Sequence, residues 1–167
     1  MQGKFEELFR DYGALLSRVA SSYEANDALQ QELLQEIAVA VWQAMARFKG
    51  NSSVKTYILK VAHNRAVSHV ASQVRAPHTE EFLDESSPDS GGRWSPEKSV
   101  EQDKSLERLL RVVRELPLPG RQVLTLSLEG LSYDEIAEVC GLTTNHVGVL
   151  LKRAKAAVNR SFQDDDA

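Results

Sequence analysis

The sequence lacks the features that mark several large classes of protein. Its 167 residues include a single cysteine, Cys140, so no internal disulfide can form, which agrees with a reducing compartment. No apolar run approaches the roughly 18 residues of a membrane span. The N-terminus carries acidic residues where a signal peptide would be basic and then apolar. We therefore expect a globular protein that stays in the cytoplasm.

Motifs of catalysis and metal binding are also missing. The four histidines show no HExxH and no pairing at i, i+4, and one cysteine provides no zinc framework. Neither a Gly-rich phosphate loop nor a GxSxG serine motif occurs. The sequence therefore predicts no enzyme, no metal and no cofactor. Because Cys140 falls on an apolar helix face, we interpret it as a small packing residue.

Acidic residues are scarce in two long stretches, although the whole chain has a net charge of −4. None occurs between Glu36 and Glu80, where six Lys and Arg stand, and none between Glu138 and Asp164, where four stand. Local charge, and not the total, decides whether a surface attracts phosphate. These stretches favour nucleic-acid binding, with two ordinary solvated helix faces as the alternative.

Strand signals are absent, and apolar residues recur at helical spacing, which predicts an all-α protein. In a first module, residues 1–75, we expect helices over about 2–23 and 27–47 and a third that ends near Arg75, separated from the second by the break at Gly50 to Ser53. Asn26 or Asp27 can cap the second helix.

Residues 76–99 change character, with three prolines, two glycines and six acids against two bases. Such a composition buries too little to order itself and predicts a flexible acidic linker. A second small module follows over 100–163, ahead of an acidic tail at 164–167. Its first helix should stop before Pro117, and another is expected over 121–128.

The second module ends in a predicted helix-turn-helix. Ser132 and Glu135 have capping-box spacing at the start of one short helix, and Gly141 can end it in the left-handed conformation. Thr143 or Thr144 can cap the next helix. Its buried face carries Val147, Leu151, Ala154 and Val158. The second helix of this motif typically enters the DNA major groove, and a plain helical hairpin is the alternative.

Two sets of motifs, in this order, resemble one family. ELLQEIAVAVWQAMARFKGNSSVKTYILKVAHN in the first module is similar to the VQE, VW, RF-x-G-x-SS and IARN-like signatures of extracytoplasmic-function (ECF) bacterial sigma factors. LPLPGRQVLTLSLEGLSYDEIAEVCG in the second resembles their LP-x-x-R-x-V opening and GLSYEEIAEILG helix-turn-helix. The resemblance implies an alternative sigma factor that binds core RNA polymerase and directs promoter recognition and transcription initiation, the polymerase performing the nucleotidyl transfer.

The resemblance also implies roles for residues of the first module. Glu32, Gln35 and Glu36 would meet a basic surface of core polymerase. The residues that would bind the melted minus-ten element and hold a flipped base are Phe48, Lys49, Asn51, Ser52, Ser53, Lys55, Tyr57, Lys60, His63, Asn64 and Arg65. For Tyr57, core packing is an equal alternative, because it also falls on the apolar face.

In the second module the resemblance implies contact with the minus-thirty-five element. Relatives tend to place Lys, Ser and Arg where this chain has Gly148, Val149 and Leu150. Base recognition is therefore expected near the start of the helix-turn-helix and its second helix, and phosphate contact further along. The base-side residues are Thr143, Thr144, Asn145 and His146, and the phosphate-side residues are Lys152, Arg153 and Lys155. Ser132 is expected to contact the same element.

A second departure concerns polymerase binding. The family commonly has a DAED-like acidic cluster where this chain has Leu29, Gln30, Gln31 and Glu32. Weakened core binding follows unless negative charge is restored, for example by a Ser/Thr kinase acting on the hydroxyls near the loop. The candidate hydroxyls are those of Ser52, Ser53 and Thr56.

Two other functions stay open beside the sigma factor. One is a two-domain DNA-binding regulator that works without lending specificity to core polymerase. The other is a sigma-like interaction protein that binds polymerase or an anti-sigma factor and does not recognise DNA. In vitro transcription with core polymerase separates the three.

Overall fold

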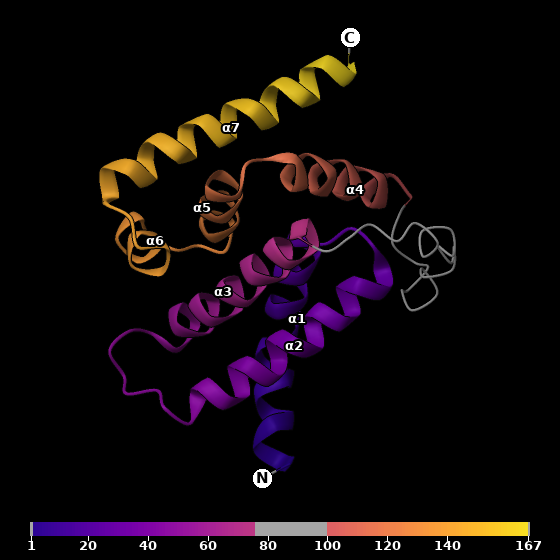
Figure 1. Cartoon of the computed structure of the whole chain (residues 1–167). Helices are drawn as coiled ribbons and strands as arrows, with labels where there is room; N and C mark the ends of the chain where they lie inside the picture. The colour runs from indigo at the N-terminus through magenta and orange to yellow at the C-terminus, as the bar shows by residue number, and fades with distance from the viewer. Residues whose placement is uncertain (1, 76–99, 167) are drawn as a thin grey trace.

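The computed structural model describes residues 2–75 and 100–166, which fold into seven helices without a strand (Figure 1). The predicted all-α class is therefore confirmed for this part of the chain. The linker predicted over 76–99 lies outside the described residues. The helices are α1 (Gln2–Tyr23), α2 (Asp27–Met45), α3 (Val54–Arg75), α4 (Val100–Glu115), α5 (Leu118–Leu128), α6 (Tyr133–Cys140) and α7 (Thr144–Asp166).

The first module packs α1, α2 and α3 around one apolar core. Its fully buried side chains recur at helical spacing, as predicted; they include Leu16, Leu33, Ile37, Ile58 and Leu59. Asn26 is the cap of α2, and its side chain accepts a hydrogen bond from the backbone N–H of Leu29 at 2.9 Å. After α2 the chain turns through Gly50, which has a φ of +80°. Glycine adopts this left-handed conformation at little steric cost.

The helix α5 begins three residues earlier than the sequence predicted. The prediction placed its start at Arg121, whereas the structure starts it at Leu118. Pro119 is compatible with the first turn, where a backbone N–H would have no partner within the helix. Gly120 then lies inside α5 and is buried.

The helix-turn-helix has the predicted caps. The Ser132 hydroxyl accepts from the Glu135 N–H at 3.2 Å, and the Glu135 carboxylate accepts from the Ser132 N–H at 2.8 Å. Gly141 ends α6 with a φ of +70°. Of the two candidates, Thr143 is the residue whose hydroxyl accepts a bond at the start of α7, from the N–H of His146 at 3.1 Å.

The helix α7 runs beyond its predicted apolar face. Val147, Leu151 and Ala154 are buried, and the helix continues to Asp166, so most of the stretch predicted as an acidic tail is helical. Near its end, the guanidinium of Arg108 in α4 lies 4.5 Å from the centre of the Phe162 ring. This contact joins the first and last helices of the second module.

A polar cluster is buried where the two modules meet. The Tyr23 hydroxyl of α1 lies 2.7 Å from Nδ1 of His63 in α3, and the guanidinium of Arg121 in α5 lies 5.5 Å from the Tyr23 ring centre. His63 is 0% exposed, and its Nε2 has no hydrogen-bond partner. Burial lowers the pKa of His63 to about 3, from an ordinary value of 6.5.

We predict that His63 makes the protein sensitive to acid. Below about pH 6.5 the unfolded chain gains a proton at this position while the folded chain does not, until the pH nears 3. The unfolding free energy should therefore fall as the pH falls, by about 2 kcal/mol between pH 7 and 5. His63→Gln keeps a polar partner for Tyr23 but has no proton to gain, so its pH dependence should be flatter.

The measurement is urea denaturation of both proteins across this pH range. His69, which lies 2.8 Å from Glu24, is present in both proteins, so their difference isolates His63. Equal slopes for the two proteins would contradict the assignment.

Candidate nucleic-acid interface

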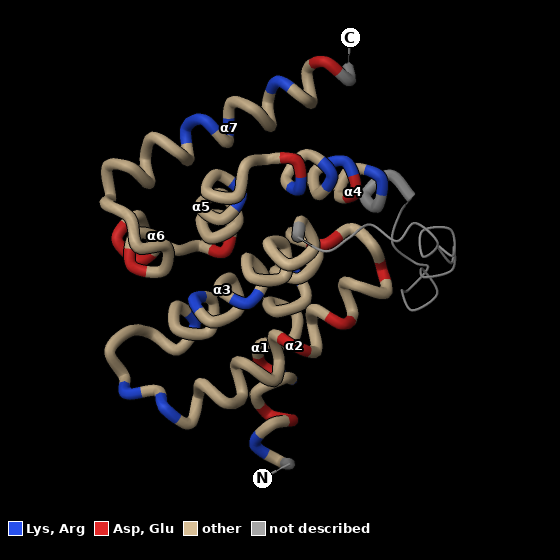
Figure 2. The backbone as a smooth tube through the Cα atoms, in the orientation of Figure 1, with Lys and Arg blue, Asp and Glu red and all other residues tan. Residues whose placement is uncertain are grey.

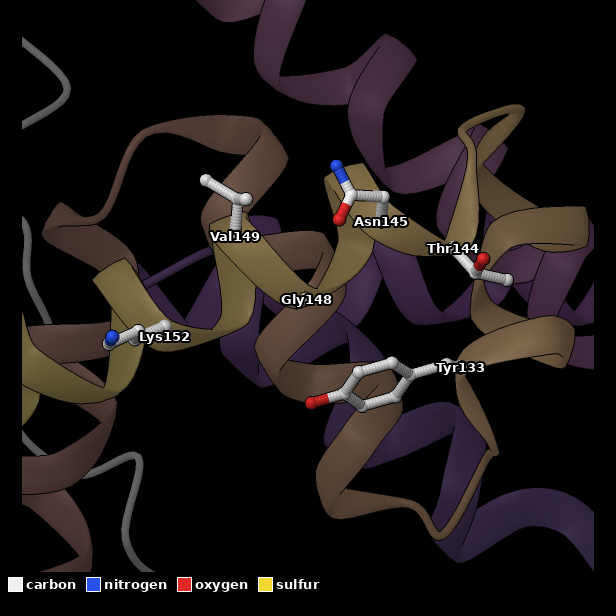
Figure 3. A pocket seen from close by; sticks show the side chains of 6 residues that line it. All are labelled: Tyr133, Thr144, Asn145, Gly148, Val149 and Lys152. Atoms are coloured by element: carbon white, nitrogen blue, oxygen red, sulfur yellow. The ribbon is translucent and has the colours of Figure 1, made fainter.

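One face of α7 is exposed to solvent and lines a surface hollow. Thr144, Asn145, Gly148, Val149 and Lys152 follow each other at helical spacing and line a common surface hollow (Figure 3). Asn145, Val149 and Lys152 are exposed, while Val147 on the opposite side of the helix is fully buried. The buried face thus holds α7 on the module and turns this set of residues outward.

The ring of Tyr133 forms the other wall of this hollow. Tyr133 is the first residue of α6 and is 48% exposed, and its ring lies beside α7 at Gly148 (Figure 3). The expectation from sequence did not include Tyr133, Gly148 or Val149. For Tyr133, the available signal in the sequence was a tyrosine at the first helical position of the predicted helix-turn-helix.

The other predicted residues of this module divide into two groups. Ser132 and Thr143 are occupied as caps, so their hydroxyls already accept backbone hydrogen bonds. His146, Arg153 and Lys155 are exposed, and none of the three is a cap. The sequence of α7 contains basic residues but no acidic residue before Asp164 (Figure 2). This face therefore presents positive charge together with short polar side chains.

Aromatic side chains pack together at the loop between α2 and α3. The rings of Phe48 and Tyr57 have centroids 4.8 Å apart, and the Tyr57 hydroxyl donates to the carbonyl oxygen of Ala44 at 2.9 Å. Tyr57 is half-buried, so it both packs and borders the surface. Lys49 and Asn51 lie exposed on the same loop.

Ser53 caps α3. Its hydroxyl accepts from the Thr56 N–H at 3.0 Å and donates to the Thr56 hydroxyl at 2.9 Å, while Ser52 is half-buried. Along α3, Lys60, Asn64 and Arg65 are exposed and share the outer surface. His63 does not join them, because the structure places its ring in the core. Its sequence position alone could not distinguish the inner from the outer face.

The predicted polymerase-binding residues lie together on α2. Glu32, Gln35 and Glu36 are exposed and line one surface hollow. Val39, one turn further on, borders the hollow and is 51% exposed, whereas Ile37 and Val41 on either side of it are 0% exposed. The Glu36 carboxylate accepts a hydrogen bond from Arg65 of α3 at 2.8 Å. This ion pair joins two residues that the sequence assigned to different surfaces.

Part of the first module's basic surface contacts the second module. The Glu129 carboxylate accepts two bonds from Arg18, at 2.7 and 3.0 Å, and the Glu129 carbonyl oxygen accepts one from Nζ of Lys55 at 2.6 Å. Thr56, 4% exposed, donates to the Glu135 carboxylate at 3.5 Å. Hydrogen bonds from Ser132 lower the pKa of Glu135 and keep it charged. We call these contacts of Glu129 and Glu135 the module latch.

Comparison with known proteins identifies both modules. Residues 8–76 match the family described as Sigma-70 region 2, and residues 106–158 match Sigma-70, region 4. The ECF RNA polymerase sigma-E factor of Escherichia coli K12 is 27% identical over 157 residues, covering 90% of this chain and 80% of its own. The chain is an ECF sigma factor of the sigma-70 family.

Other relatives and solved structures agree. The RNA polymerase sigma-H factor of Pseudomonas aeruginosa is 28% identical over 148 residues, covering 84% of this sigma factor and 76% of the relative. The fold is similar to RpoE of Bartonella quintana in complex with the anti-sigma factor NepR (TM-score 0.72, 18% identity, 96% and 97% covered). It is also similar to CnrH in complex with the cytosolic domain of CnrY (0.67, 20%, 100% and 92%).

Its activity follows from this membership. The sigma factor binds core RNA polymerase and promoter DNA and directs promoter recognition and transcription initiation. In the described parts of the chain, every helix is too short or too polar to cross a membrane. Within the same ranges no group of His, Cys, Asp and Glu is placed to hold a metal ion. The Cys140 thiol, half-buried in α6, has its pKa raised to about 11 by burial, which keeps it unreactive.

We predict that charge at Glu129 controls the separation of the modules. Glu129→Lys places a positive charge beside Arg18 and Lys55, so repulsion replaces the ion pair. The radius of gyration measured by small-angle X-ray scattering should increase. The double variant Arg18→Glu with Glu129→Lys restores opposite charges, and its radius of gyration should return toward the original value. Identical scattering from all three proteins would show that the latch does not hold the modules.

Proposed function

We propose that this sigma factor divides its work among three surfaces. The acidic hollow on α2, built by Glu32, Gln35 and Glu36, binds core polymerase. The loop at Lys49 to Ser53 with the outer face of α3 binds the melted minus-ten strand, and the outer face of α7 binds the minus-thirty-five duplex. The observation that carries the proposal is that the two sigma regions occur in order, each with exposed basic side chains on a helix poor in acid: α3 has no acidic residue and α7 has none before Asp164.

At the minus-ten element the chain would hold a base outside the stack. A flipped base needs a stacking partner, since unstacking costs a few kcal/mol. Phe48 and Tyr57 stand beneath the loop, and Lys60, Asn64 and Arg65 supply charge and hydrogen bonds along α3. We assign no base contact to the buried His63 and propose that it orients Tyr23 instead.

The chemistry of transcription belongs to the polymerase in this proposal. The sigma factor contributes binding surfaces and no catalytic group, and it works in the cytoplasm, where the polymerase acts. Polymerase binding would have to open the module latch, because Lys55 and Thr56 contact the second module in the structure.

We propose two regulatory partners. RpoE is seen in complex with the anti-sigma factor NepR, and CnrH in complex with the cytosolic domain of CnrY. An anti-sigma factor that holds the modules together is thus a natural partner for this chain. A Ser/Thr kinase is the other, acting on Ser52, Ser53 or Thr56. Thr56 is 4% exposed and faces Glu135, so its phosphorylation requires an open latch and opposes closure by like-charge repulsion.

The decisive experiment is in vitro transcription with core polymerase at a promoter mapped in the source genome. The full chain should start transcripts there, and Glu32→Lys with Glu36→Lys should remove both core binding and transcription, since the basic surface of the polymerase would meet positive charge. Glu6→Lys with Glu7→Lys, exposed on α1, is the matched control and should retain activity.

The other outcomes identify the competing functions. Specific binding of promoter DNA without core polymerase, and no transcripts with it, indicates a DNA-binding regulator. Binding to core polymerase that never leads to initiation indicates a sigma-like interaction protein. Either result overturns the proposed division of surfaces.

We predict different roles for Asn145 and Lys152 on α7. An amide side chain can pair with an adenine edge, whereas a lysine ammonium neutralises phosphate. Asn145→Ala should therefore change the order of preference among promoter variants. Lys152→Ala should weaken all of them alike and lower the slope of log affinity against log salt by about one. Equal loss at every promoter from both substitutions would contradict this division.

A further inference from the structure

The hollow on α7 is apolar where a DNA-binding helix is usually polar. Its six lining residues are Tyr133, Thr144, Asn145, Gly148, Val149 and Lys152 (Figure 3). Val149 is 39% exposed and Tyr133 48%, in contrast to the fully buried Val147 and Ile136 of the same two helices. Both exposed side chains are therefore available to a group that enters the hollow from outside.

Gly148 sets the shape of the hollow. A Cβ at this position would lie 3.4 Å from Cε2 of Tyr133, in van der Waals contact with the ring, and would fill the space that glycine leaves beside it. Glycine inside a helix is less stable than alanine by about 1 kcal/mol, so helix stability does not explain its presence. Because Gly148 has no side chain, space is left between the Tyr133 ring and the Val149 side chain.

The charge around the hollow suits DNA better than a protein partner. Lys152 closes one end, Arg153 and Lys155 follow on α7, and the helix has no acidic residue before Asp164. Asp134 is the acidic neighbour of Tyr133 along α6. In the major groove, the one apolar group that a base presents is the C5-methyl of thymine. An apolar floor with a basic rim therefore matches a thymine edge between phosphates.

We propose that this hollow receives the C5-methyl group of a thymine in the minus-thirty-five element. Val149 and the Tyr133 ring contact the methyl, Gly148 leaves the space for it, and Asn145 recognises a neighbouring base. The three residues that determine this specificity are thus Tyr133, Gly148 and Val149. The inference rests on the proposed function, in which α7 enters the major groove of the promoter.

The test replaces thymines of the minus-thirty-five element one at a time by deoxyuridine, which lacks only the methyl group. Binding of each duplex to the complex of sigma factor and core polymerase is measured by competition. At one or two positions the uracil duplex should bind about fourfold more weakly, the effect of one buried methyl group. No change at any thymine in either strand would overturn the proposal.

Variants assign the effect to the hollow. Val149→Ser removes the apolar contact and Gly148→Ala puts a methyl group into the space that the thymine methyl would occupy, so each variant should bind thymine and uracil duplexes equally. Lys155→Ala, outside the hollow, is the matched control, since it should weaken both duplexes by the same factor and preserve the fourfold ratio. A ratio that survives in both hollow variants would show that the methyl is sensed elsewhere, and would overturn the proposal.

Two further results distinguish failure of this inference from failure of the proposed function. Loss of core binding by Val149→Ser, together with equal binding of thymine and uracil duplexes by the original protein, would assign the hollow to a protein partner and overturn the inference alone. If the complex binds the promoter no better than a scrambled duplex, the inference and the proposed function are both overturned. The uracil comparison uses the unaltered chain, so it does not depend on the folding of any variant.

Discussion

The arrangement of this sigma factor depends on the buried contact of Tyr23, His63 and Arg121, which comes from three helices and both modules. Arg121 also donates to the carbonyl oxygens of Arg114 and Leu116, so the same guanidinium closes the turn between α4 and α5. Arg114 in turn donates to the carbonyl oxygen of Ser21 in α1. The bond between Tyr23 and His63, the bonds from Arg121 to these carbonyl oxygens and the contact of Arg121 with the Tyr23 ring are buried together, and they orient α5 against α1.

The orientation of α5 has different consequences for the two proposed DNA-binding surfaces. It brings Glu129, just beyond the end of α5, against Arg18 and Lys55, so Lys55 of the proposed minus-ten surface contacts the second module. The helix α7 lies on the side of the second module away from α1, α2 and α3 (Figure 1), and Asn145 and Lys152 on it are exposed. The Arg18 side chain is 58% exposed, so solvent weakens its ion pair and the covering contact can be exchanged for another partner.

Much of the fold could be predicted because its signals are local. The caps at Asn26 and Ser132 and the left-handed turn at Gly141 each involve residues within four positions of one another, and all three are confirmed. The predicted start of α5 at Arg121 is wrong because Pro119 and Gly120, which precede it, both fit a first helical turn. At the candidate site, Tyr133 and Val149 were missed, since exposure on the outer face depends on which side of α7 packs inward.

The sequence by itself determined the seven helices, the two modules and the family, because periodicity, capping and motif order are encoded by neighbouring residues. Only the tertiary structure decided which way His63 faces and which residues meet across the modules. Lys55 and Glu129 are 74 positions apart and Arg18 and Glu129 are 111 apart, so no local pattern specifies either contact. Such pairs form only when burial of the apolar faces has oriented the helices, and that depends on the whole chain at once.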